Sequence, residues 1–222
     1  GDVYKRQPHI HPLSRVWLQA CQEYGLPYNP DFNSGKPEGC GFYQITSRNG
    51  LRSSAAAAYI RPAKGRKNLS VRTGCKVEKI LFDGTVAKGV VYSEKGVRKE
   101  LYANKEIILS AGAIATPQLL MVSGIGPAAH LQAQGVALVK DLPGVGRNLQ
   151  DHIEISMVYE LTGPHSYDKY KKPLWKAAAG LQYGLFRSGP AASNLIEAGA
   201  FWWGQKAEKT PDIQYLSLIH IS

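Results

Sequence analysis

Residues 105–152, KEIILSAGAIATPQLLMVSGIGPAAHLQAQGVALVKDLPGVGRNLQDH, decide the fold class of this chain. The apolar run at 107–109 is typical of a short strand that is buried on both faces. Small residues follow, and then Thr116 is suited to cap a helix that has Pro117 in its first turn. Gly124 suits the left-handed position just after that helix. A strand that leads through small residues into a helix is typical of α/β nucleotide-binding proteins.

On each side of this stretch, hydrophobic periodicity and turn residues predict the remaining elements. Helices are expected at residues 9–25, 53–60 and 174–186, and strands at 76–82, 86–93, 98–103, 153–159, 195–203 and 212–215. Residues 28–50 are rich in Asn, Asp, Pro and Gly, and this composition predicts an irregular surface loop.

The composition argues against several classes of protein. The formal charge is +10, but the basic residues are scattered and no zinc-finger, RNP-type or basic-helix pattern accompanies them, so we expect no nucleic-acid binding. Cys21, Cys40 and Cys75 are odd in number and far apart, which argues against a disulfide scaffold or a zinc site and fits a reducing compartment. No apolar run approaches the roughly 20 residues of a transmembrane helix. We therefore expect a cytoplasmic protein without a transmembrane segment, and leave peripheral attachment to the inner membrane open.

The opening stretch resembles signatures of the glucose–methanol–choline (GMC) oxidoreductases, a family of FAD-dependent alcohol dehydrogenases and oxidases, and is most similar to choline dehydrogenase-like bacterial members. The matching residues are Gly112-Ala113-x-x-Thr116-Pro117-x-Leu119-Leu120-x-x-Ser123-Gly124-Ile125-Gly126 and Leu142-Pro143-Gly144-Val145-Gly146-x-Asn148-Leu149-Gln150-Asp151-His152. The resemblance implies an α/β (α+β) fold, with part of a Rossmann-like FAD-binding domain and part of a substrate domain built on an antiparallel sheet.

The resemblance also implies the domain limits. Residues 8–68 are expected to form a substrate-domain and connecting segment, 69–152 a portion of the FAD-binding domain, and 153–215 a second portion of the substrate domain. Residues 1–7 and 216–222 resemble translated sequencing-adapter sequence and are left out of the fold prediction. We expect the native gene to continue past both ends, so that this chain is an internal fragment.

Two groups of residues are candidates for binding FAD. Small side chains at Ser110, Ala111 and Gly112 let a ligand approach the backbone, and the following helix offers its positive end to an anion. The resemblance places them beside the ADP half of FAD, and tight strand–helix packing is the alternative. Val77 lies where the family uses main-chain groups of a valine to hold the adenine ring, although it could equally be an ordinary buried strand residue.

A polar cluster follows the PGVG loop at Asn148, Asp151 and His152. Asp151 and His152 are adjacent and no further ligand falls at helical spacing, so we expect no metal site here. The resemblance places the cluster near the flavin, with structural capping of the loop as the alternative. The nearby G-x-G-x-x-A pattern that begins at Gly124 follows a helix, so we do not expect it to be a pyrophosphate loop.

Glu197 is an acidic residue inside an otherwise apolar predicted strand, where a carboxylate needs a partner. In choline-oxidising members, the resemblance implies that a glutamate at this position faces the quaternary ammonium of the substrate, and aromatic rings complete a cage. Trp202 and Trp203 could supply such rings or could be ordinary core residues.

The resemblance implies oxidation of an alcohol to an aldehyde with transfer of a hydride to flavin N5. The substrate would be choline or another primary alcohol, and the electron acceptor, oxygen or a quinone or dye, stays open. The histidines of this chain do not match the catalytic histidine of the family, so we assign no catalytic residue and expect this chain alone to be inactive. The alternatives are an FAD-dependent hydroxynitrile lyase on the same fold and a non-catalytic basic nucleotide-binding fragment.

Overall fold

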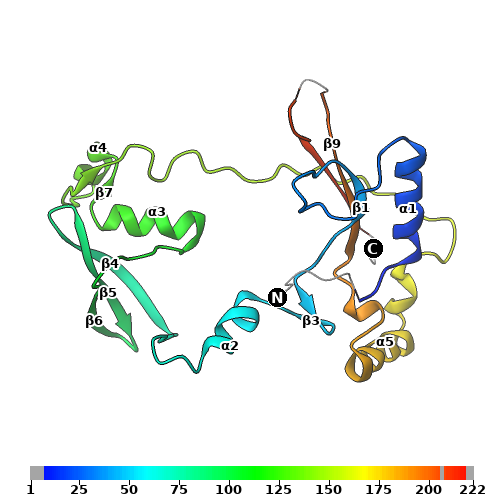
Figure 1. Ribbon diagram of the computed structural model, residues 1–222, viewed down its shortest axis with the longest axis horizontal. Helices are drawn as coiled ribbons and strands as arrows, with labels where there is room; N and C mark the ends of the chain where they lie inside the picture. The colour runs from blue at the N-terminus through cyan, green and yellow to red at the C-terminus, as the bar shows by residue number, and fades with distance from the viewer. Residues whose placement is uncertain (1–7, 206–207, 219–222) are drawn as a thin grey trace. The chain divides into compact units, whose positions relative to one another are not determined.

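The computed structural model describes residues 8–205 and 208–218, which form two compact units along the chain (Figure 1). Unit 1 combines the residues up to 69 with those from 158 onward, and unit 2 consists of residues 70–157. Helices and strands are mixed in both units, as the sequence predicts. Each unit is described by itself below.

Unit 1 is centred on a three-stranded antiparallel sheet, which confirms the predicted second sheet. Its order is β1-β9-β10, with β1 at Gly39–Phe42, β9 at Ile196–Trp202 and β10 at Ile213–Leu218. Helix α1 (Pro12–Glu23) covers this sheet, and its Leu18 joins Leu26, Cys40, Ala198 and Ala200 in the buried apolar core. The helix begins with a proline in its first turn and is followed by Gly25 at φ +103°, where the sequence predicts its end.

Strand β1 corrects the prediction that residues 28–50 form an irregular surface loop. A Cβ atom at Gly39 would collide with the carbonyl oxygen of Pro27, and one at Gly41 would collide with that of Asn29. Both glycines therefore allow two backbone segments to approach each other closely, and Gly39 also has a φ of +106°, which favours glycine by itself. Two short strands, β2 (Ser47–Arg48) and β3 (Leu51–Arg52), complete this part of the chain as a hairpin.

The helices of unit 1 follow the predicted positions. The helix expected at 53–60 is present as the π-helical turn η1 (Ala56–Ile60) and the short α2 (Arg61–Ala63), and the hydroxyl of Ser54 accepts a hydrogen bond from Ala57 N at 3.3 Å. The other helices are the 3₁₀ turns η2 (Tyr167–Lys171) and η3 (Pro190–Ala192) and the predicted α5 (Pro173–Phe186). Among the described residues, none of the helices is both long enough and apolar enough to cross a membrane.

Unit 2 contains the predicted three-stranded meander, followed by small helical and strand elements. The meander consists of β4 (Cys75–Asp83), β5 (Val86–Glu94) and β6 (Val97–Tyr102), and it is followed by α3 (Gly112–Val122), β7 (Ile125–Gly126), α4 (Ala128–Ala133) and β8 (Lys140–Asp141). Helix α3 is joined to the meander through the buried Ser123. Its hydroxyl accepts a hydrogen bond from Ile80 N at 2.9 Å and donates one to Leu119 O at 2.6 Å.

The start of α3 differs from the prediction. The helix begins at Gly112, so Thr116 is not its cap and Pro117 lies inside the helix. The proline ring removes the N–H that would pair with the carbonyl of Ala113, but that first turn is exposed, so water can satisfy the carbonyl. The predicted end is confirmed, because Gly124 has φ +94° immediately after the final turn.

Two predicted strands are absent. Residues 107–109 and 153–159 carry no strand. The side chains of 153–159 are exposed, with Ile153 at 96%, and in the first segment Ile108 is 78% exposed while Ile107 and Leu109 are partly buried. An apolar run or an alternating pattern becomes a strand only when a neighbouring strand pairs with its backbone. Among the described residues, no strand pairs with either segment.

Candidate functional site

Glu197 is the most completely buried acidic group of unit 1, with 0% of its surface exposed on β9. Its Oε2 accepts hydrogen bonds from His11 N at 2.5 Å and from the Ser14 hydroxyl at 2.8 Å. Its Oε1 accepts hydrogen bonds from the Ser193 hydroxyl at 2.6 Å and from the Tyr167 hydroxyl at 3.2 Å. These four donors compensate the carboxylate for the water that it loses on burial.

The donors come from three elements that the fold brings to β9. His11 and Ser14 lie at the start of α1, so the carboxylate also faces the positive end of that helix. His11 fixes this end, since its Nδ1 accepts a hydrogen bond from Leu13 N at 3.2 Å. Tyr167 belongs to η2, and Ser193 lies in the turn before β9. Of these partners, only Ser193 is a close neighbour of Glu197 in sequence, and sequence reasoning missed all four.

An open depression of about 320 Å³ lies beside this cluster. Its lining includes His9, His11, Tyr167, Lys169 and Tyr170, whereas Glu197 is not part of the lining. The rings of His11 and Tyr167 have their centroids 4.6 Å apart. Burial raises the pKa of the Tyr167 hydroxyl, and the charge of Glu197 raises it further. Burial also lowers the pKa of His9 and of His11, which favours the neutral form of both imidazoles.

The aromatic partners of Glu197 differ from those considered in the sequence. Trp202 is the last residue of β9 and Trp203 follows it, and their ring centroids are 5.3 Å apart. At about 3.3 Å per residue, Trp202 is about 16 Å along the strand from Glu197. The fold brings the Tyr167 hydroxyl and the main-chain N–H of His11 to the carboxylate instead.

Ser110, Ala111 and Gly112 lie in unit 2 just before and at the first residue of α3, and all three are exposed. No side chain caps this end of the helix, and Gly112 has φ +89° with open space where a Cβ would point. Beyond its chain neighbours and the backbone of its own helix, no heavy atom of the described residues lies within 4 Å of the place where a Cβ of Gly112 would be. An uncapped, exposed helix end that is preceded by small side chains fits the approach of an anionic group such as a diphosphate.

Val77 lies on β4, which is an edge strand of the meander. It pairs with Tyr92, and the register then shifts so that Glu78 bulges out of the pairing. Its exposed fraction is 41%, so it is not a buried strand residue. Main-chain groups beside a bulge on an open edge are accessible to a flat ring, which fits the predicted adenine contact.

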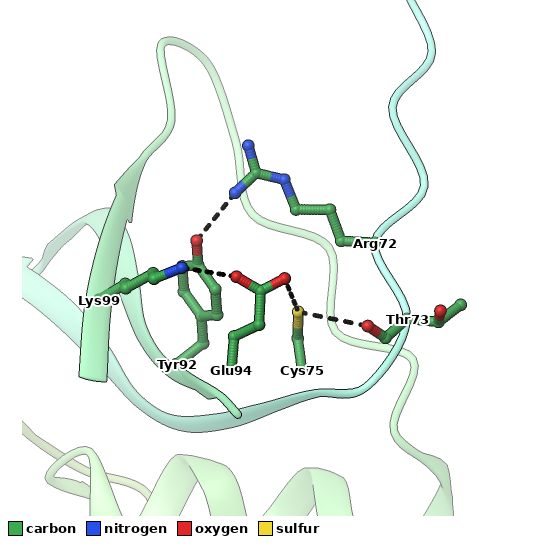
Figure 2. Close-up of polar contacts among 6 residues, drawn as sticks. All are labelled: Arg72, Thr73, Cys75, Tyr92, Glu94 and Lys99. Carbon is green, nitrogen blue, oxygen red and sulfur yellow. Dashed lines mark hydrogen bonds and ion pairs between the residues drawn. The ribbon is translucent and has the colours of Figure 1, made fainter. Parts of the chain in front are cut away.

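A polar cluster that sequence reasoning missed surrounds the start of β4 (Figure 2). Arg72 Nη1 donates to the Tyr92 hydroxyl at 2.8 Å, and Lys99 Nζ pairs with Glu94 Oε2 at 2.6 Å. The Cys75 thiol faces Glu94 Oε1 at 3.8 Å. The Lys99 ammonium lowers the pKa of Glu94, and Glu94 in turn raises that of Lys99. The cluster connects all three strands at the end of the meander that carries Val77.

Asn148, Asp151 and His152 lie on an exposed stretch without regular secondary structure. Asn148 has φ +56°, and Asp151 Oδ1 accepts a hydrogen bond from the neighbouring His152 N at 2.8 Å. Within unit 2 these residues therefore make a local contact rather than a packed polar cluster. Among residues 8–205 and 208–218, no group of three His, Cys, Asp or Glu side chains is placed to hold a metal ion.

Residues 2–154 match a family model described as GMC oxidoreductase. Mitochondrial choline dehydrogenase of Homo sapiens is 43% identical over 205 residues, which cover 92% of this chain and 34% of the relative. Oxygen-dependent choline dehydrogenase of Sinorhizobium medicae is 40% identical over 95% of this chain and 38% of its own length. An FAD-dependent oxidoreductase from Chaetomium thermophilum superposes with a TM-score of 0.81 at 30% identity, covering 91% of this chain and 36% of that structure. The chain thus spans about a third of the length of these relatives.

Proposed function

The chain belongs to the GMC oxidoreductase family, and we propose that it is part of a longer FAD-dependent enzyme that oxidises an alcohol to an aldehyde. The observation that carries the proposal is the 40–43% identity to choline dehydrogenases over more than 90% of the chain. The proposed substrate is a small primary alcohol, with choline as the first candidate.

Unit 2 offers the surfaces that suit FAD. The open start of α3 at Ser110, Ala111 and Gly112 would receive the anionic ADP half, and the main chain of Val77 would contact the adenine ring. Asn148, Asp151 and His152 remain proposed contacts toward the flavin. Bound FAD would supply the acceptor for the hydride that leaves the carbinol carbon.

Glu197 remains a proposed contributor to substrate recognition. Its donors hold the carboxylate in one orientation, and Tyr167 and His11 stand between it and the depression beside them. The Tyr167 ring could meet a quaternary ammonium by a cation–π contact, with the charge of Glu197 behind it. Lys169 in the same lining opposes a cation, so binding has to be measured directly.

The test uses the complete reading frame that contains this chain. We expect the purified protein to carry flavin absorbance that bleaches when choline or another primary alcohol is added without oxygen. Tetramethylammonium has the same charged group as choline but no hydroxyl, and should not bleach the flavin. A complete protein that neither contains nor binds FAD would overturn the proposal. Cleavage of a hydroxynitrile without flavin reduction would favour the lyase alternative.

The role of Glu197 is tested in the same complete enzyme. If the carboxylate attracts the ammonium group, Glu197→Gln should raise the KM for choline at least tenfold and leave the KM for an uncharged primary alcohol nearly unchanged. Equal effects on both alcohols would indicate that Glu197 acts only by holding the surrounding structure.

A further inference from the structure

The open depression beside Glu197 has a permanent positive charge in its lining. Of the described residues that line it, none is acidic, and Lys169 is the one whose side chain is charged throughout the ordinary pH range. Glu197 lies outside the lining, and its carboxylate is already bound by four donors. A ligand that enters the depression therefore meets the positive charge first.

Aromatic rings hold the Lys169 ammonium beside the depression. Its Nζ lies 5.1 Å from the ring centroid of Tyr170, which belongs to the lining, and 5.6 Å from that of Trp175, in the first turn of α5. Both distances are in the range of cation–π contacts. Among the described residues, no carboxylate forms an ion pair with Lys169, whereas Lys171 pairs with Asp168 at 2.9 Å. The positive charge therefore has a fixed place beside the depression.

This ammonium is close to the part of the depression where the alcohol is proposed to bind. The Tyr170 ring lies 5.9 Å from the Tyr167 ring, and the proposed function places the ammonium group of the alcohol beside Tyr167. Two imidazoles of the lining also sense the charge. Burial is the main cause of the lowered pKa of His9 and of His11, and the lysine charge lowers both further, against the raising effect of Glu197. A ligand cation in the depression would meet the same repulsion.

We propose that Lys169 is a specificity-determining residue, which weakens the binding of cationic alcohols in the depression and leaves that of uncharged alcohols unchanged. The inference rests on the proposed function, because it takes the depression as the place where the alcohol binds. Two effects act against a cation. The ammonium of Lys169 repels it, and the faces of Tyr170 and Trp175 that could attract it are already occupied. An uncharged alcohol of the same shape meets neither effect.

The experiment measures binding to the purified chain, which requires neither FAD nor turnover. Tetramethylammonium and the uncharged 2,2-dimethyl-1-propanol are titrated at pH 8 in about 10 mM salt, where the Debye length is about 30 Å. The imidazole signals of His9 and His11 are followed by NMR. Lys169→Met should lower the Kd of tetramethylammonium about two- to tenfold, and Lys169→Glu should lower it further. The Kd of the uncharged alcohol should stay the same.

Three controls separate the effect of charge from that of structure. Lys169→Arg keeps a positive charge over the rings and should bind tetramethylammonium as the wild type does. Lys176→Met removes a lysine charge from α5 outside the lining and should change this Kd by less than about twofold. In about 1 M salt, where the Debye length is about 3 Å, the difference between the wild type and Lys169→Met should become smaller.

Several results would overturn the inference. One is an unchanged Kd of tetramethylammonium in both Lys169→Met and Lys169→Glu. Another is an equal gain for the charged and the uncharged ligand, which would indicate a change of shape rather than of charge. A third is the absence of tetramethylammonium binding in the wild type and in every variant. The proposed function fails by a different result, namely a complete protein that neither binds FAD nor oxidises an alcohol.

Discussion

Glu197 is a fully buried acidic residue of unit 1 that accepts four hydrogen bonds. Because its four donors are bound to a buried carboxylate, replacement should cost stability in proportion to the number of donors left unpaired. Glu197→Leu removes every acceptor and should cost about 3–5 kcal/mol of unfolding free energy. Glu197→Gln keeps one oxygen for His11 N and Ser14, and its amide can donate to the two hydroxyls of the other pair, so about 1–2 kcal/mol is expected.

Urea unfolding of the purified chain measures the free energy of unfolding of both Glu197 variants. Glu23→Gln is the matched control, since Glu23 is exposed near the end of the same helix α1, and it should change the free energy by about 0.5 kcal/mol or less. Equal losses for Glu197→Gln and Glu197→Leu would contradict the hydrogen-bond scheme.

The lowered pKa values of two histidines beside Glu197 predict how the stability of the folded chain depends on pH. Burial lowers the pKa of His9 and His11 below the ordinary value of 6.5, so the folded state binds fewer protons than the unfolded state. Stability should therefore be full above about pH 6.5 and fall as the pH drops below it. Protonation of His11 Nδ1 would also remove the acceptor that caps α1. His11→Asn retains a capping side chain without a charge change, and should flatten the dependence of the melting temperature between pH 7 and pH 5.

At the scale of the element, α3 offers two glycines with the same backbone demand and different surroundings. Gly112 and Gly124 both have positive φ, at +89° and +94°. A Cβ at Gly112 meets open space, whereas one at Gly124 would lie 2.5 Å from the carbonyl oxygen of Ala137. Gly112→Ala should therefore cost about 1 kcal/mol from backbone strain alone, and Gly124→Ala about 3 kcal/mol or more. Hydrogen exchange of the amides in β4 and α3 measures this difference in stability. A larger loss of stability for Gly112→Ala than for Gly124→Ala would contradict the prediction.

The elements that sequence predicts correctly are those with local causes. The meander of unit 2 and helix α5 follow from alternation, helical periodicity and turn residues within each segment. Strand β1 could not be recognised, because its glycines are set by contact with Pro27 and Asn29. The strands predicted at 107–109 and 153–159 are absent because an apolar pattern also needs a neighbouring strand to pair with. Among the described residues, no strand pairs with either segment.

At the scale of the whole molecule, the stretch at 149–161 connects the end of unit 2 to the second part of unit 1 without regular structure. Its apolar side chains are exposed, which makes it the preferred place for a protease that cuts after apolar residues. Brief digestion of the chain with chymotrypsin should give first cuts after Tyr159 or its neighbours, while the buried Tyr167 is spared. First cuts inside β4, β5 or α1, read by mass spectrometry, would contradict this order of stability.

The sequence by itself determined the family, the mixed fold class and most elements, because motifs and periodic patterns are properties of neighbouring residues. It also indicated that the small residues before α3 and the acidic residue in β9 are unusual. Only the tertiary structure decided what surrounds them: Glu197 is bound by His11 and Ser14, which lie 186 and 183 positions away. Such contacts depend on how strands and helices pack after they form, and no local pattern encodes that packing.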